Sequence, residues 1–264
     1  MILRSLTEHV RTQNWFAVGL DFLIVVVGVF IGIQVSNWNA ARLERVIERD
    51  TLIRLYADFQ ESIAGLDRDL RFLEQQLADQ QVVIRSLDAC DVAPEADAIF
   101  QRGVVTLGFV NRPRLYRRTI DEIAASGRTD IIQNTVLADE LAGIVAHAEW
   151  RADSHDQVVL IIETHKHHIE SYLRYTLEVT FPDAFIPNHR GGVTHDIKAM
   201  CADPQVANSV SAISYVTHER LEAHRALLER YKRFAPEITE ELASRWGVEI
   251  GANARSTAQD GIKP

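Results

Sequence analysis

The chain has 264 residues, of which 47% are hydrophobic, and a formal net charge of −9. This length accommodates one membrane span and one further domain of ~200 residues. The acidic balance argues against a nucleic-acid partner, because proteins that bind nucleic acids present basic faces. Only seven prolines and thirteen glycines interrupt the chain, which favours long helices.

Residues 1–14 form a short N-terminal segment with an apolar stripe at helical spacing, made by Leu3, Leu6 and Val10. A stripe of this kind predicts an interfacial helix that lies on a membrane surface.

The segment Phe22–Ala41 is twenty residues long and carries no charge. A helix of this length measures about 30 Å, the thickness of the hydrocarbon core of a bilayer. Trp15 and Trp38 flank the apolar core, where indoles favour the membrane–water interfaces. We predict a transmembrane helix over residues 15–39. A cleaved signal peptide is disfavoured, because no A-x-A-like triplet follows the apolar core.

Small residues recur every four positions in this span, at Gly28, Gly32 and Ser36. Small side chains let two helix backbones approach closely in a membrane. The pattern predicts self-association of the span, although glycine is common in membrane helices generally.

The string GVFIGIQVSNWN, which contains Gln34, Asn37, Trp38 and Asn39, resembles the end of the span in a family of uncharacterised bacterial single-span membrane proteins, a domain of unknown function. In that family a Gln-x-x-Asn-Trp-Asn-like signature closes the span, and a long helix follows. The stretch Thr119–Trp150 resembles the family's middle segment more loosely. The resemblance implies a topology and no catalytic residues.

A long helix is predicted to continue from Leu43 to about Leu87. Its apolar residues recur at alternating spacings of four and three, which is typical of a coiled-coil or bundle seam. These seam positions are Leu52, Tyr56, Phe59, Ile63, Leu66, Leu70, Leu73, Leu77, Gln80, Ile84 and Leu87.

Proline and glycine divide the rest of the chain. Pro94 is predicted to open a short helix to Thr106, and Pro113 another that ends at Gly127. A second long helical stretch covers Thr135–Phe181, as one helix or as two, and an antiparallel pairing with the first long helix is the economical arrangement. A loop from Pro182 to Gly192, a third long helix from Pro204, a short helix over Ile238–Trp246 and a disordered tail from residue 248 complete the pattern.

We therefore expect an all-α fold, in which one N-terminal transmembrane helix continues into an elongated antiparallel helical bundle over residues 40–247. Four arginines occur within seven residues, at Arg112, Arg114, Arg117 and Arg118. They suit an anion site, but a solvated helix start balanced by nearby acids is the favoured interpretation.

The most chemical-looking cluster contains Glu163, His165, His167 and His168, whose spacings place imidazole and carboxylate groups on common helix faces. HExxH is absent and no second ligand helix is identifiable, because His218 and His224 lie six residues apart. We treat metal binding or enzymatic activity through this cluster, Glu163–Glu170, as the alternative function.

The sequence contains no phosphate-binding loop, GxSxG elbow, dinucleotide fingerprint or CxxC motif. We expect no catalytic residues and no cofactor. The predicted function is a non-enzymatic, membrane-anchored bundle that binds the lipid bilayer, forms a homo-oligomer through the span or the heptad seam, and contacts an envelope protein in a sensor-like or scaffold role.

Charge alone leaves the orientation open, because arginines stand on both sides of the span. Large domains cross membranes largely regardless of charge, and the family resemblance implies a cytoplasmic N-terminus. We expect a bacterial inner-membrane protein with its C-terminal domain in the periplasm. A disulfide between Cys90 and Cys201 is compatible with that compartment, provided that the fold brings the two residues together.

Overall fold

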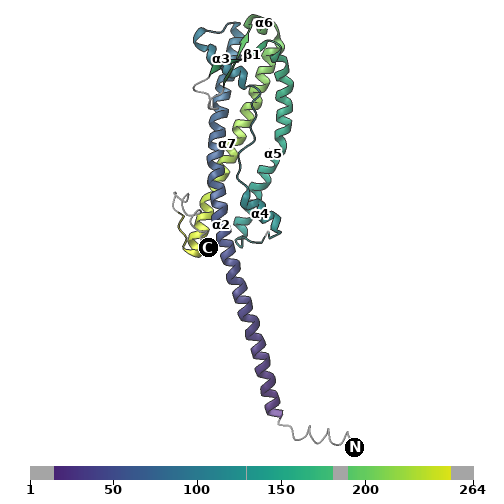
Figure 1. The fold of residues 1–264 in the computed structure, drawn as a ribbon, viewed down its shortest axis with the longest axis vertical. Helices are drawn as coiled ribbons and strands as arrows, with labels where there is room; N and C mark the ends of the chain where they lie inside the picture. Colours follow the sequence, from purple (N-terminus) through teal and green to yellow (C-terminus); the bar gives the residue numbers. More distant parts are fainter. Residues whose placement is uncertain (1–14, 129, 181–189, 251–264) are drawn as a thin grey trace, which may run out of the picture. The chain divides into compact units, whose positions relative to one another are not determined.

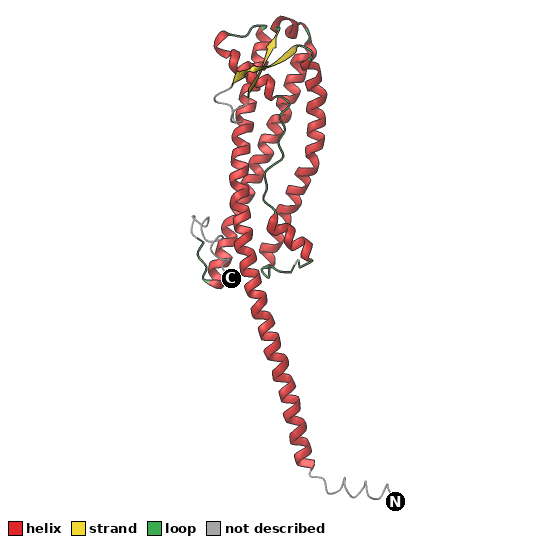
Figure 2. Ribbon diagram, in the orientation of Figure 1, coloured by secondary structure: helices red, strands yellow, loops and turns green. Residues whose placement is uncertain are grey.

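The computed structural model describes residues 15–128, 130–180 and 190–250, and the side chains of 15–18, 177–180, 190 and 191 lie outside this description. The chain divides into two compact units at Asp50 and Thr51. In chain order the elements are α2 (Trp15–Ala89), η1 (Pro94–Ala96), α3 (Asp97–Thr106), α4 (Arg118–Ser126), α5 (Thr135–Glu170), β1 (Leu173–Thr180), β2 (Arg190–His195), α6 (Ile197–Ala202) and α7 (Pro204–Trp246). The predicted all-α class with a long N-terminal helix is confirmed (Figure 2).

The first unit contains the apolar part of α2. Its large side chains are exposed on every side, including Phe22, Phe30 and Val35, and an 18-residue window near the N-terminus has a mean hydropathy of 2.2. By length and composition, this helix is able to cross a membrane. The predicted interfacial segment, residues 1–14, lies outside the described residues.

The core of the second unit is built on α2 and α7, which run in opposite directions. The Phe59 ring stacks on that of Tyr231, with centroids 4.5 Å apart. Farther along, Glu74 pairs with Arg225, and Gln80 donates to Thr217 at 3.2 Å. The heptad seam of α2 is therefore buried within its own chain: Leu52, Phe59, Leu66, Leu73 and Gln80 are each at most 1% exposed.

Residues 107–117, which we call the strap, begin with a turn, have no regular secondary structure after it and return along α2 (Figure 1). The prediction that Pro113 opens a helix is wrong, because polar side chains of α2 bind the backbone of this region instead. Ser62 Oγ accepts from the Tyr116 N–H at 2.8 Å, and an oxygen of Asp69 accepts from the Arg114 N–H at 3.2 Å. A Cβ at Gly65 would lie 2.7 Å from the Arg114 carbonyl oxygen, so the close approach of the strap requires glycine there.

The strap brings the chain back to the part of α2 around Asp58, where Thr119 donates to the Asp58 carboxylate. α5 therefore runs parallel to α2 rather than antiparallel to it. α7 lies between them and is antiparallel to both (Figure 1). The contacts of α5 establish its direction: Asn134, at its start, donates to Glu241 near the end of α7, whereas His165 lies beside Ser209.

The second long helix ends at Glu170, and the chain then forms a two-stranded antiparallel hairpin, which the sequence analysis had placed in a helix and a loop. Tyr175 lies opposite Val193, and Thr176 opposite Gly192. Tyr175, Thr176 and Val193 are residue types that favour strands, and Val193 enters the apolar core at this end of the bundle.

Several predicted boundaries are confirmed. Gly127 and Gly247 end α4 and α7 with φ of 68° and 64°, values that favour glycine. Pro204 occupies the first position of α7. The predicted break at Pro236, with a separate short helix over Ile238–Trp246, is wrong. α7 continues through Pro236, because Phe234, Ile238 and other buried residues hold the helix to the core on both sides of it.

Residues 248–250, which were predicted to belong to a disordered tail, are ordered against the core. Val248 donates to the Leu242 carbonyl at 3.2 Å and, with Ile250, packs against the core, while residues 251–264 lie outside the described residues.

Candidate functional site

A cleft of about 420 Å³ lies in the second unit, between α5, α7 and the strap. Its volume falls within the range of small-molecule sites. Four charged side chains and two imidazoles line it, together with an apolar wall. The charged and imidazole residues are Arg151, Arg220, Glu219, Glu222, His155 and His224, and the apolar ones are Pro113, Val158, Ile161, Val216 and Ala223.

Arg220 is the most buried cation of the cleft, with 5% of its surface exposed. Its guanidinium donates to the carbonyls of Phe109 and Asn111 in the strap, at 3.4 and 3.5 Å. Burial, and then repulsion from Arg151, lower its pKa to about 10, although the charge of Asp69 opposes this shift. Asp69 itself pairs with Arg114, so Arg220 forms no ion pair within the described part of the chain.

His224 lies one helical turn beyond Arg220 and is 4% exposed. Its Nδ1 is 2.8 Å from the Arg220 carbonyl oxygen, so this nitrogen carries the proton and donates it. Burial lowers the pKa of His224 to about 4, and the charges of Arg220 and Arg151 act in the same direction. The ring is therefore neutral at physiological pH, and Nε2 holds a free lone pair.

Arg151 and His155 face these groups from α5. Burial lowers the pKa of Arg151, and the charge of Glu219 opposes that shift. Burial and the positive charges of Arg112 and Arg220 lower the pKa of His155. The other acid, Glu222, pairs with Arg225 at 2.6 Å. The cleft therefore favours negative charge in a ligand.

Among the described residues that line the cleft, no hydroxyl is hydrogen-bonded to an imidazole or a carboxylate. Ser154 is the hydroxyl that lines the cleft, and its Oγ donates to the Arg151 carbonyl of its own helix at 3.0 Å. Cations beside an apolar wall bind and orient an anion, which is a recognition property.

The histidine cluster singled out from the sequence is spread around α5. Lys166 pairs with Glu163 and with Glu170, at 3.7 and 3.2 Å. His165 Nδ1 lies 3.4 Å from Ser209 Oγ, while His167 and His168 are exposed. Across the described ranges, no three His, Cys, Asp or Glu residues gather as metal ligands would.

The arginines between residues 112 and 118 do not gather at one anion site, because three of them pair with different acids. Arg112 pairs with Asp156 at 2.9 Å, and Arg117 with Glu149 at 2.8 Å. Acids balance these arginines, but the predicted helix start at Pro113 is wrong, because α4 begins only at Arg118. Gly28, Gly32 and Ser36 lie on the exposed helix of the first unit.

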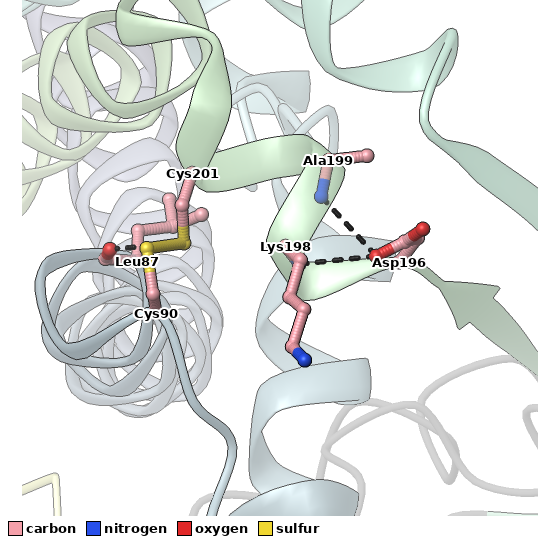
Figure 3. The surroundings of a disulfide bond; sticks show 6 residues. All are labelled: Leu87, Cys90, Asp196, Lys198, Ala199 and Cys201. Carbon is pink, nitrogen blue, oxygen red and sulfur yellow. Dashed lines mark hydrogen bonds between the residues drawn. A yellow bond between two sulfur atoms is a disulfide. The ribbon is translucent and has the colours of Figure 1, made fainter.

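Cys90 and Cys201 form a disulfide, with their Cα atoms 5.6 Å apart (Figure 3). Cys90 follows the end of α2 and has a φ of 51°. Cys201 lies in the short helix α6, whose first turn is capped by Asp196: its carboxylate accepts from the N–H groups of Lys198 and Ala199, both at 3.1 Å. The bond joins two segments that are 111 residues apart.

The cleft was not predicted from the sequence. Its one local signal is that Thr217, Arg220 and His224 interrupt the apolar stripe of α7 at helical spacing. Arg151 and His155 gave no signal, because solvated residues of these types are common on helices.

No protein-family model, curated protein or solved structure matches the chain. The resemblance to the single-span membrane family stays a prediction.

Proposed function

We propose that the chain is a non-enzymatic, single-span protein of a bacterial inner membrane, whose helical domain lies in the periplasm and acts as a sensor-like or scaffold module for an envelope partner. One observation carries this proposal. The apolar residues of α2 before Asp50 are exposed all around the helix, with Phe22 at 71% and Phe30 at 60%. A helix that is apolar on every side needs lipid or protein around it.

The disulfide supports the periplasmic location. Disulfides persist in oxidising compartments and are rare in the cytosol. Both cysteines of the chain take part in the bond between Cys90 and Cys201.

The proposed self-association rests on the span. The heptad seam is occupied by packing against α7, as the burial of Leu66 and Leu73 shows. Gly28 and Gly32, in contrast, have no atom within 4 Å of the position that a Cβ would take.

Fusion of alkaline phosphatase after Pro264 tests the location, since this enzyme becomes active only where its own disulfides form. We expect an active fusion, and a non-fluorescent product when a green fluorescent protein of the kind that folds only in the cytoplasm replaces it. An inactive phosphatase fusion with a fluorescent counterpart would place the domain in the cytoplasm and end the envelope-partner proposal.

Substitution Gly32→Ile tests self-association. We expect weaker association of the span in a membrane dimerisation assay, because isoleucine holds two backbones apart. Phe30→Ile, on the opposite face of the helix, is the matched control. If both variants associate as the wild type does, the glycine face contacts lipid rather than a second copy.

A further inference from the structure

We propose that the cleft between α5, α7 and the strap is a binding site for a small organic monoanion, a carboxylate with an apolar body, whose carboxylate group pairs with Arg220 and Arg151. This inference goes beyond the proposed function, because it depends neither on the side of the membrane nor on self-association.

The balance of charge indicates the sign and number of ligand charges. Glu222 is paired with Arg225, and Glu219 lies near Arg151. Arg220 forms no ion pair among the residues that the structure describes, and its two bonds to strap carbonyls are long. The charge of Asp69 acts on Arg220, but Asp69 pairs with Arg114. Three arginines, Arg114, Arg151 and Arg220, therefore face two acids, Asp69 and Glu219, and one positive charge remains. One negative charge compensates it, whereas a dianion would meet repulsion from the two glutamates.

Because Arg220 is buried, its uncompensated positive charge costs free energy, and this cost suggests that a ligand supplies the opposite charge. A buried charge without a partner is unfavourable, so proteins rarely keep one that has no role. A guanidinium presents a planar fork of donors that matches a carboxylate in two hydrogen bonds. Arg220 has only neutral carbonyl partners in the strap, and a bound carboxylate would supply the missing charge.

The remaining lining indicates the body of the ligand. Val158 and Ile161 on α5 face the same cleft as Val216 and Ala223 on α7, with Pro113 contributed by the strap. A volume of about 420 Å³ matches a small molecule rather than a polymer. A benzoate-like or short aliphatic carboxylate places its charge beside the arginines and its apolar body against the apolar wall of the cleft.

Fluorine NMR on the full chain, in nanodiscs of zwitterionic lipid, tests the proposal with para-fluorobenzoate as the probe. Fluorohexanoate is a second carboxylate, para-fluorobenzyl alcohol a neutral probe of similar shape, and inorganic phosphate a competitor. We expect saturable binding of a carboxylate, with the alcohol weaker by about tenfold or more, as for the loss of a charged hydrogen bond.

Two variants locate the site. Arg220→Met should weaken carboxylate binding by about tenfold or more and leave binding of the alcohol unchanged. Arg230→Met, which removes an exposed arginine of the same helix, is the matched control and should bind as the wild type does. Ala223→Trp fills the cleft without removing charge and should abolish binding, which keeps the test decisive if Arg220→Met does not fold.

Three results would each overturn the proposal: no saturable binding of either carboxylate to the wild type, equal binding of the alcohol, or unchanged binding in folded Ala223→Trp. Displacement of the carboxylate by phosphate at equal concentration would also overturn it, in favour of an inorganic anion. None of these outcomes affects the phosphatase-fusion result, so the two proposals fail separately.

Discussion

Removing the Cys90–Cys201 disulfide should lower the free energy of unfolding by about 4 kcal/mol, near the upper end of the usual effect because the closed loop is long. The two cysteines are 111 residues apart, so the bond removes much of the freedom of the unfolded chain. Urea unfolding of the full chain in detergent, followed by circular dichroism, measures the difference between the oxidised protein and a variant carrying both Cys90→Ser and Cys201→Ser.

The loss of stability should be greatest in α6 and the residues next to it, which the disulfide holds in place. α6 has six residues, too few to be stable as an isolated helix. The disulfide and the burial of Met200 hold it against the end of α2. Hydrogen exchange should therefore rise most in residues 190–203 after reduction.

The double serine variant is also the control for the reducing agent. Because this variant has no disulfide, the reducing agent should leave the unfolding curve of the variant unchanged. Equal stability of the oxidised wild type and the double variant would contradict the prediction.

The second large effect concerns pH. His224 has a pKa of about 4 in the folded domain, against an ordinary value of 6.5. Between these two values the unfolded chain binds a proton that the folded domain does not, so stability increases with pH in this window. The full contribution is present above pH 6.5 and is lost as the pH falls towards 4. At pH 5 this loss amounts to about 2 kcal/mol relative to pH 8.

The measurement compares the pH dependence of the free energy of unfolding in the wild type and in His224→Gln. Glutamine does not titrate and still offers a donor for the Arg220 carbonyl, which His224 Nδ1 occupies at 2.8 Å. The slope between pH 5 and pH 6 should be smaller in the variant by close to one bound proton.

His218→Gln is the matched control, because His218 is exposed on the same helix. It should keep the slope of the wild type. If His224→Gln kept that slope as well, the imidazole would not be buried in neutral form.

Local patterns predicted much of the architecture correctly. The uncharged stretch from Phe22 to Ala41 predicts the apolar helix by length and composition alone. The heptad seam identifies the buried face of α2, and glycine at 127 and 247 marks helix ends, because a left-handed residue is needed there. These features depend on residues that are close together in the chain.

The course of the strap was not predicted, although α2 contains a trace of it. Ser62, Asp69 and Gln76 are polar residues spaced seven apart on one face of α2, and all three are buried. Polar residues at such positions need partners, and these partners are backbone groups of the strap and of the end of α3. Sequence alone does not indicate which distant segment supplies them.

The sequence by itself therefore determined the long apolar helix near the N-terminus, the other long helices and most of their ends, because hydrophobic period and capping chemistry act over a few residues. Only the tertiary structure decided that α5 runs parallel to α2, that Cys90 meets Cys201, and that Arg151 and Arg220 share a cleft. The physical reason is that the strap reverses the chain through hydrogen bonds to side chains some 45 to 54 residues earlier, and no local preference encodes such a contact.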